Sequence, residues 1–195
     1  MTALGFRIKS GRAIAVVLAG SASAPNPVAR QIVELCDPAD ADTRQPYHHG
    51  FYTHEEDATE IARRVTIVER CAAESIAALV ASATDTGAVR RDACRAVLVV
   101  GSVIDPAAVA NPHIRAHASE GKLFRVVVED ALRVHGIESD VIVDKTLTAT
   151  AAKRLGRTDG EIRQTVAALG RTLGGPWRAD EKAAAMAAWL ALPRR

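Results

Sequence analysis

Near its C-terminal end the chain reads Ala179-Asp180-Glu181-Lys182-Ala183-Ala184-Ala185-Met186-Ala187-Ala188-Trp189. Two acidic residues stand at the start of this stretch, and small apolar residues fill the turns that follow. The pattern predicts a helix over residues 178–192. Because strand and helix patterns alternate in the chain before it, we expect this helix to close an α/β domain.

Strand patterns come first in the chain. Apolar stretches on either side of a Ser10-Gly11 turn predict two strands of a hairpin, or one bent strand, over residues 6–18. Residues 29–35 predict a further strand, which gives an antiparallel meander. The compact β-branched run at residues 95–100 is typical of a buried central strand. Another strand is predicted at residues 141–143.

Helix patterns follow the meander. Apolar residues recur every three or four positions from Ile61 to Leu79, and Thr53 with Glu56 three residues later predicts a capping box at the start of this helix. Further helices are predicted over residues 112–135, 149–155 and 159–173. The element order predicts an α/β fold with a mixed sheet, in which three antiparallel N-terminal strands join parallel strands and helices flank the sheet. We expect a single domain over residues 1–195.

Composition limits the class of protein. The chain has 195 residues, 48% of them hydrophobic and only 4% aromatic, and a formal net charge of +2. This charge neither demands nor excludes a nucleic-acid partner. The three cysteines form no CxxC pair, which favours a reducing cytoplasm over a disulfide scaffold. No signal peptide is recognised, and the apolar run at residues 13–24 is too short to span a bilayer, so we expect no membrane partner.

The segment of residues 37–52 lacks periodicity and gathers histidine and aromatic side chains. It contains Tyr47, His48, His49 and Tyr52, and His54 lies close by. Histidine is a common metal ligand, so His48 and His49 are candidate metal ligands. The alternative is a loop that its aromatic residues hold against the domain while the histidines face solvent.

The start of the helix predicted over residues 112–135 is the densest polar feature. His113 and His117 lie four residues apart on one face, and Glu120 follows three residues later. Two histidines and a carboxylate in this order can bind a metal ion or act as a base with an orienting group. The helix N-terminus can also receive an anion. We therefore take His113, Arg115, His117 and Glu120 as candidate binding residues, with a solvated helix face as the alternative.

Four segments in the second half of the chain carry a resemblance to a known family. They are the strand Ala96-Val97-Leu98-Val99-Val100, the helix segment His117-Ala118-Ser119-Glu120-Gly121, the basic segment Lys153-Arg154-Leu155-Gly156-Arg157 and the closing helix quoted above. In this order they resemble the RuvC-type Holliday-junction resolvases of the ribonuclease-H-like superfamily. The element order of the whole chain is similar to that of the superfamily. The resemblance implies a ribonuclease-H-like fold.

The same resemblance implies a site where about four carboxylates hold two divalent metal ions for phosphodiester cleavage. The sequence departs from this pattern. Lys9 or its neighbours stand where the first carboxylate belongs, and no acidic residue precedes residue 31. Gly101-Ser102 follow the central strand at the position expected for the second carboxylate. Asp105 lies too far along the chain to occupy that position. The closing helix offers Asp180 and the adjacent Glu181, but alanines occupy the next turn.

These departures favour a binding or regulatory module that is not a nuclease, and nucleic acid is a compatible partner. The binding residues are then expected near the retained cleft, and they are His113, Arg115, His117, Glu120 and Lys9. No cofactor is identified from the sequence.

Two alternatives stay open at this point. The first is an enzyme, either a divergent metal-dependent nuclease or another hydrolase, that uses Asp105, Asp180, Glu181 and the histidines. A divalent metal ion is then required, and its candidate ligands are His48, His49 and Asp180. The second alternative is a structural protein that forms a homodimer through the apolar helix at residues 183–192.

Overall fold

The computed structural model describes residues 1–50, 53–85 and 94–194. Its centre is a five-stranded sheet with the strand order β3-β2-β1-β4-β5. The antiparallel pairs are β1–β2 and β2–β3, and the parallel pairs are β1–β4 and β4–β5. The predicted mixed sheet is therefore confirmed. The strands are β1 (Thr2–Lys9), β2 (Arg12–Ser21), β3 (Ala24–Glu34), β4 (Cys94–Val100) and β5 (Glu138–Val143).

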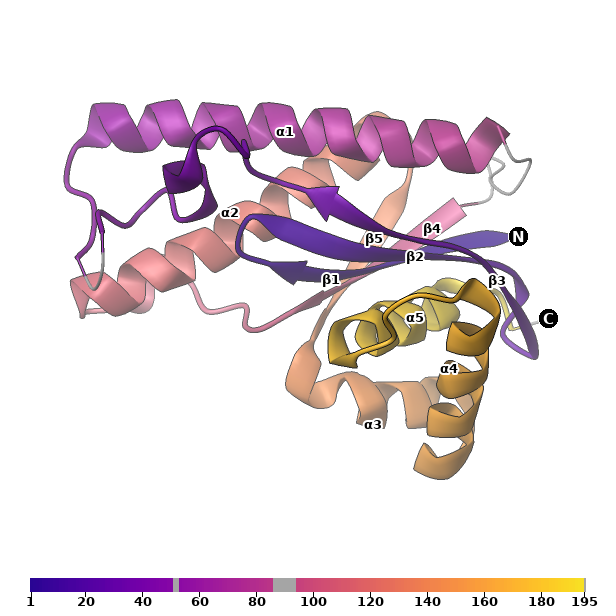
Figure 1. Ribbon diagram of the computed structural model, residues 1–195. Coiled ribbons are helices and arrows are strands. Elements are labelled where there is room, and N and C mark those ends of the chain that lie inside the picture. The colour runs from indigo at the N-terminus through magenta and orange to yellow at the C-terminus, as the bar shows by residue number, and fades with distance from the viewer. Residues whose placement is uncertain (51–52, 86–93, 195) are drawn as a thin grey trace.

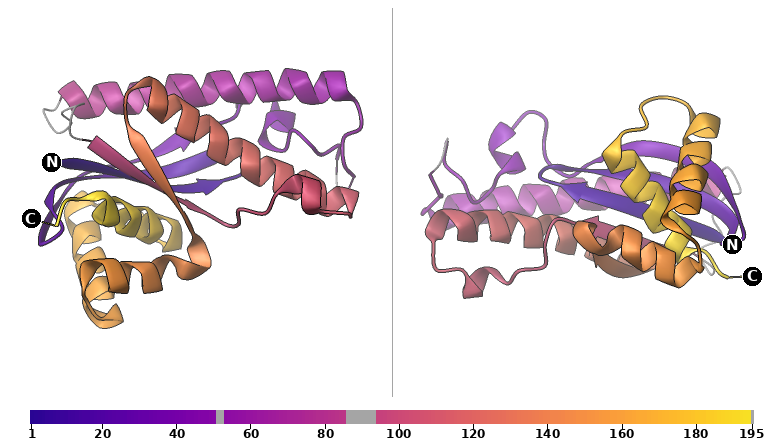
Figure 2. Two further views of the ribbon diagram at one scale, coloured as in Figure 1. Left: turned by 180° about the vertical axis from the view of Figure 1, so that it is seen from behind. Right: turned by 90° about the horizontal axis from the view of Figure 1, so that it is seen from below.

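Helices cover both faces of the sheet (Figure 1). The helices α1 and α2 lie on one face, and α3, α4 and α5 lie on the other (Figure 2). None of the helices in the described residues is long and apolar enough to cross a bilayer. The helices are α1 (Ala58–Asp85), α2 (Pro112–Val134), α3 (Asp144–Leu155), α4 (Asp159–Leu173) and α5 (Ala179–Ala191), with short 3₁₀ turns at η1 (Ala41–Arg44) and η3 (Pro106–Ala108).

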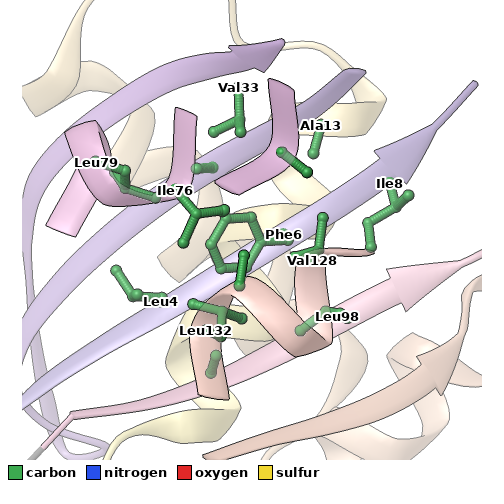
Figure 3. Close-up of a cluster of buried hydrophobic side chains, with 14 of the residues drawn as sticks. Leu4, Phe6, Ile8, Ala13, Val33, Ile76, Leu79, Leu98, Val128 and Leu132 are labelled. Carbon is green, nitrogen blue, oxygen red and sulfur yellow. The ribbon is translucent and has the colours of Figure 1, made fainter. Parts of the chain in front are cut away.

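The central strand β1 divides the apolar core into two layers. Successive side chains of a strand point to opposite faces of the sheet. Leu4, Phe6 and Ile8 accordingly belong to the layer under α1 and α2, where Phe6 lies among side chains of both helices (Figure 3). Ala3 belongs to the opposite layer, which α3, α4 and α5 cover. Arg7 has the same parity as Ala3, so its side chain starts on the α5 face.

The helix α5 packs with its backbone directly on β1. A Cβ atom at Gly5 would clash with the carbonyl oxygen of Ala184 and the backbone nitrogen of Ala188, and it would lie 2.9 Å from the Cα of Ala188. Trp189 is fully buried, and its indole N–H donates to the carbonyl oxygen of Ala22 at 2.8 Å. The apolar residues of α5 therefore fill this chain's own core. The hypothesis that they present a partner face is wrong.

Several element boundaries differ from the sequence prediction. The first helix begins at Ala58, because the carboxylate of Asp57, not the hydroxyl of Thr53, accepts from the backbone N–H groups of Thr59 and Glu60. The third strand begins earlier than predicted and includes two prolines, which an edge strand tolerates. The fifth strand begins at 138 and α3 at 144. The first turns of α3 carry one buried apolar residue, Leu147, which gives little periodic signal.

The contact between α5 and β1 predicts the effect of two glycine substitutions. Gly5→Ala should lower the free energy of unfolding by about 3 kcal/mol or abolish folding, because two backbones would have to separate to admit a methyl group. Gly121, in the middle of α2, has no heavy atom within 4 Å of an added Cβ. Gly121→Ala should therefore raise stability by about 0.5–1 kcal/mol through helix propensity.

Urea denaturation followed by circular dichroism measures both changes. If Gly5→Ala left the unfolding midpoint unchanged or raised it, the close approach of α5 to β1 would be wrong.

Candidate functional site

Four charged side chains meet where β1 ends and α3 and α5 begin. The Arg7 guanidinium lies 3.0 Å from Asp144 Oδ2 and 3.6 Å from Asp180 Oδ1. The Lys9 ammonium lies 3.3 Å from the same oxygen of Asp180. Arg7 also donates to the carbonyl oxygens of Ile8 and Val99 at 3.3 and 3.4 Å. We call Arg7, Lys9, Asp144 and Asp180 the ion cluster.

The ion cluster is formally neutral, and its cations come from the protein itself. The side chain of Arg7 is only 9% exposed, whereas that of Lys9 is 44% exposed. A guanidinium can satisfy two carboxylates at once because its N–H donors point in several directions in one plane. Arg7 therefore joins α3 to α5 across the end of β1, and Lys9 adds a second, more accessible positive charge to Asp180.

The other two acidic candidates lie outside the ion cluster. Glu181 is buried, and its carboxylate accepts from the Arg178 backbone N–H at 2.9 Å and from Arg30 at 3.1 Å. Burial raises the pKa of Glu181, but these hydrogen bonds lower it by a larger amount. The pKa of Glu181 is therefore below its usual value. Asp105 caps η3 and lies 3.7 Å from the Lys122 ammonium. Only Asp180 of the three predicted acids is in the ion cluster.

The sequence prediction missed Arg7 and Asp144. Arg7 and Lys9 share a face of β1 because they are two residues apart, and this parity was the available signal for Arg7. Asp144 directly follows β5, and the C-terminal ends of β1, β4 and β5 lie at the same end of the sheet. Parallel neighbouring strands place such terminal residues side by side. The predicted strand also ends at residue 143, so the position of Asp144 directly after it was an available signal.

A second group of polar side chains lies near the start of α2. His48, His113 and His117 each offer a ring nitrogen, and these atoms lie within 4.8 Å of one another. The ring centroid of His48 is 5.1 Å from that of His113 and 4.3 Å from that of His117, and the latter two are 4.6 Å apart. We call these three residues the histidine cluster. It brings together the loop and the helix start that the sequence singled out separately.

The carboxylate of Glu120 lies close to two members of the histidine cluster. Its Oε1 lies 2.7 Å from Nδ1 of His48, and its Oε2 lies 3.7 Å from Nδ1 of His117. Burial raises the pKa of Glu120 to about 7. Burial, and then the charge of His54, lower the pKa of His48. Both shifts disfavour a permanent buried charge on the pair.

Arg64 of α1 holds the loop that carries His48. Its side chain is 4% exposed, and it donates to the carbonyl oxygen of His48 at 2.9 Å. It also lies 3.2 Å from Glu55 and 3.0 Å from Glu60. These contacts make Arg64 the anchor that fixes His48 against α1. The starts of α1 and α2 lie at the same end of the molecule (Figure 1).

Two other predicted residues, His49 and Arg115, lie apart from the histidine cluster. The His49 side chain is 76% exposed and lies 3.3 Å from Glu55. The two neighbouring histidines of this loop therefore do not share one site, because His48 is buried in the histidine cluster and His49 faces solvent. Arg115 donates to the carbonyl oxygens of Val109 and Ala110 at 2.8 and 3.0 Å. It ties down the segment before α2. Tyr52 lies outside the described residues.

A surface hollow joins the two clusters. A cavity of about 250 Å³ is lined by Arg7 and Lys9 on one side and by His117 and Glu120 on the other. A second cavity of about 400 Å³ is lined by all members of the histidine cluster. His117 therefore borders both cavities, and the candidate site extends from the end of β1 to the start of α2.

Comparison with known proteins identifies the fold. No known family profile matches the sequence, and no curated protein matches it. Among solved structures, the Thermus thermophilus RuvC structure is similar at a TM-score of 0.54 and 11% identity, over 97% of this chain and 92% of that chain. T. thermophilus RuvC in complex with Holliday junction substrate is similar at a TM-score of 0.52 and 11% identity, over 97% and 91% of the two chains. The chain thus has a ribonuclease-H-like fold of the RuvC type, as the sequence resemblance implied.

The ion cluster predicts unequal effects for its two cations. Arg7→Met should lower the free energy of unfolding by about 2–3 kcal/mol, because it removes charged hydrogen bonds from a buried donor. The half-exposed Asp144 keeps some water, which limits the loss. Lys9→Met should cost under about 1 kcal/mol, since an exposed pair contributes little.

Chemical denaturation at neutral pH measures the two losses. Equal losses for the two variants would contradict the central position of Arg7 in the ion cluster.

Proposed function

We propose that this chain is a nucleic-acid-binding domain that does not cleave phosphodiester bonds with divalent metal ions. The observation that carries the proposal is the position of Arg7. Its guanidinium lies between Asp144 and Asp180, the carboxylates at the starts of α3 and α5. A protein cation therefore occupies the place where a metal ion would need free carboxylate oxygens.

The residues of the ion cluster do not fit a two-metal centre. Such centres hold two cations about 3.5–4 Å apart and need several carboxylates around them. The strand β1 contributes Arg7 and Lys9 instead of an acid, and Gly101 and Ser102 follow β4. Two divalent ions beside two fixed protein cations would be strongly repelled. The nuclease alternative that used Asp180 therefore loses its support.

The surroundings of the ion cluster suit a phosphate backbone. Lys9 presents a half-exposed ammonium to the hollow beside the cluster. Lys145 and Lys182 stand in the first turns of α3 and α5, next to the cluster's acids. Lysine and arginine contacts to phosphates supply most of the affinity in sequence-independent binding. A solved structure of similar fold contains a Holliday junction substrate, which makes branched DNA the first ligand to test.

A binding assay tests this proposal directly. We expect fluorescence anisotropy to detect binding of a four-way DNA junction or a duplex, with affinity that falls steeply from about 50 to about 200 mM salt. Lys9→Ala should weaken binding about threefold to tenfold and reduce the salt slope by about one, because one phosphate contact is lost. The matched control is Arg133→Ala, since Arg133 is exposed, lines a cavity beside the start of β5 and pairs only with Asp130 among the described acids.

The same samples should show no cleavage in Mg²⁺ or Mn²⁺. Either of two results would overturn the proposal. One is metal-dependent cleavage that Asp180→Asn abolishes. The other is the absence of salt-sensitive binding to junction, duplex and single-stranded DNA.

A further inference from the structure

We propose that His48, His113 and His117 bind one divalent transition-metal ion of the zinc type, and that Glu120 positions two of the three imidazoles. This site uses other residues than the ion cluster, although His117 and Glu120 line the same cavity of about 250 Å³ as Arg7 and Lys9. Its ligands come from a loop before α1 and from two successive turns of α2.

The spacing of the three rings suits a shared ion. Their candidate ligand atoms lie within 4.8 Å of one another. A tetrahedral zinc ion bonds nitrogen at about 2.0–2.1 Å, which places its ligand nitrogens about 3.4 Å apart. His113 and His117 occupy adjacent turns on one face of α2, and the side chain of His117 is 52% exposed. Binding of one ion therefore requires side-chain rotation that shortens the distances between the ligand nitrogens to about 3.4 Å.

Glu120 directs the histidines in the way that carboxylates do in metal sites. A ligating histidine usually donates its other ring N–H to a carboxylate, which fixes the tautomer and the orientation of the ring. Here the carboxylate of Glu120 is 2.7 Å from Nδ1 of His48 and 3.7 Å from Nδ1 of His117. When both Nδ1 atoms carry protons, both Nε2 lone pairs are available to an ion.

His48 supplies an independent sign of a missing ligand. Its side chain is only 4% exposed. Its Nε2 is buried and has no hydrogen-bond partner among the described residues. A buried polar atom without a partner costs about 1–3 kcal/mol. This nitrogen belongs to a ring that lies beside the rings of His113 and His117, so an ion bound among the three would satisfy it.

The ligand set selects the class of ion. Imidazole suits zinc, copper, nickel and iron, whereas magnesium and calcium prefer oxygen. Three histidines leave a fourth position, and the cavity of about 400 Å³ beside them is also lined by Asp42 and Gln45. Zinc sites with three protein ligands keep water or a small molecule in this position. The site is therefore an open one, able to accept an exogenous ligand.

Metal titration of the untagged full chain tests the site. After treatment with a chelator, calorimetry with Zn²⁺ should show one ion bound per chain, and Mg²⁺ should not compete. Co²⁺ should give the intense visible absorption of a tetrahedral site. His117→Ala should weaken Zn²⁺ binding at least about tenfold. This side chain is half exposed, so the variant should fold, and circular dichroism verifies that.

Two further variants separate ligation from general surface binding. His49→Ala changes an exposed histidine on the same loop as His48 and should leave Zn²⁺ affinity unchanged. Glu120→Gln keeps the shape of the side chain but replaces one acceptor oxygen with an NH₂ donor, which forces one imidazole into the wrong tautomer. It should weaken binding about 10–100-fold.

Three outcomes would overturn the proposal. They are no Zn²⁺ binding by the folded chain, an equal loss for His49→Ala and His117→Ala, and a Co²⁺ spectrum of a hexahydrated ion. Repeating the DNA-binding measurement in the presence of a chelator distinguishes failure of the metal site from failure of the proposed function.

Discussion

The guanidinium of Arg7 joins three elements that are distant in sequence. It extends from the central strand β1 to Asp144 at the start of α3 and Asp180 at the start of α5. The approach of α5 to β1 makes this geometry possible, because the helix backbone lies directly over Gly5. With the helix so close, Asp180 lies within reach of Arg7 and Lys9 on the same face of the strand. The sequence resemblance implies acidic residues that hold metal ions on such a scaffold. In this chain the scaffold stays the same, but the site holds protein cations.

Much of the fold was predictable from sequence because its signals are local. Alternation in the first strands, the β-branched run of β4 and the helix of small residues at the C-terminal end each indicate an element directly. The resemblance then placed Asp180 and raised Lys9 as its neighbour. The role of Arg7 was not evident from the sequence. A single arginine in an apolar strand only interrupts the apolar pattern, and its role depends on the packing of α5 on that face of the strand.

The candidate site was harder to predict because its parts lie far apart in the chain. His48 and Glu120 are separated by 72 positions, and no local pattern predicts that they touch. Sequence singled out His48 and His49 together, yet one is buried and the other faces solvent. The difference depends on Arg64, which fixes the backbone at His48. Contacts between polar side chains that are distant in sequence thus determine which of the predicted residues come together in the site, and periodicity alone does not predict these contacts.

The central claim is that Arg7 replaces metal ions in a ribonuclease-H-like site. The most direct measurement is anomalous diffraction from a crystal of this protein soaked in Mn²⁺, an ion that prefers carboxylate oxygens. The account predicts no anomalous peak between Asp144 and Asp180, with the Arg7 guanidinium in clear density at that position. A manganese peak between the two carboxylates, with Arg7 displaced, would contradict it.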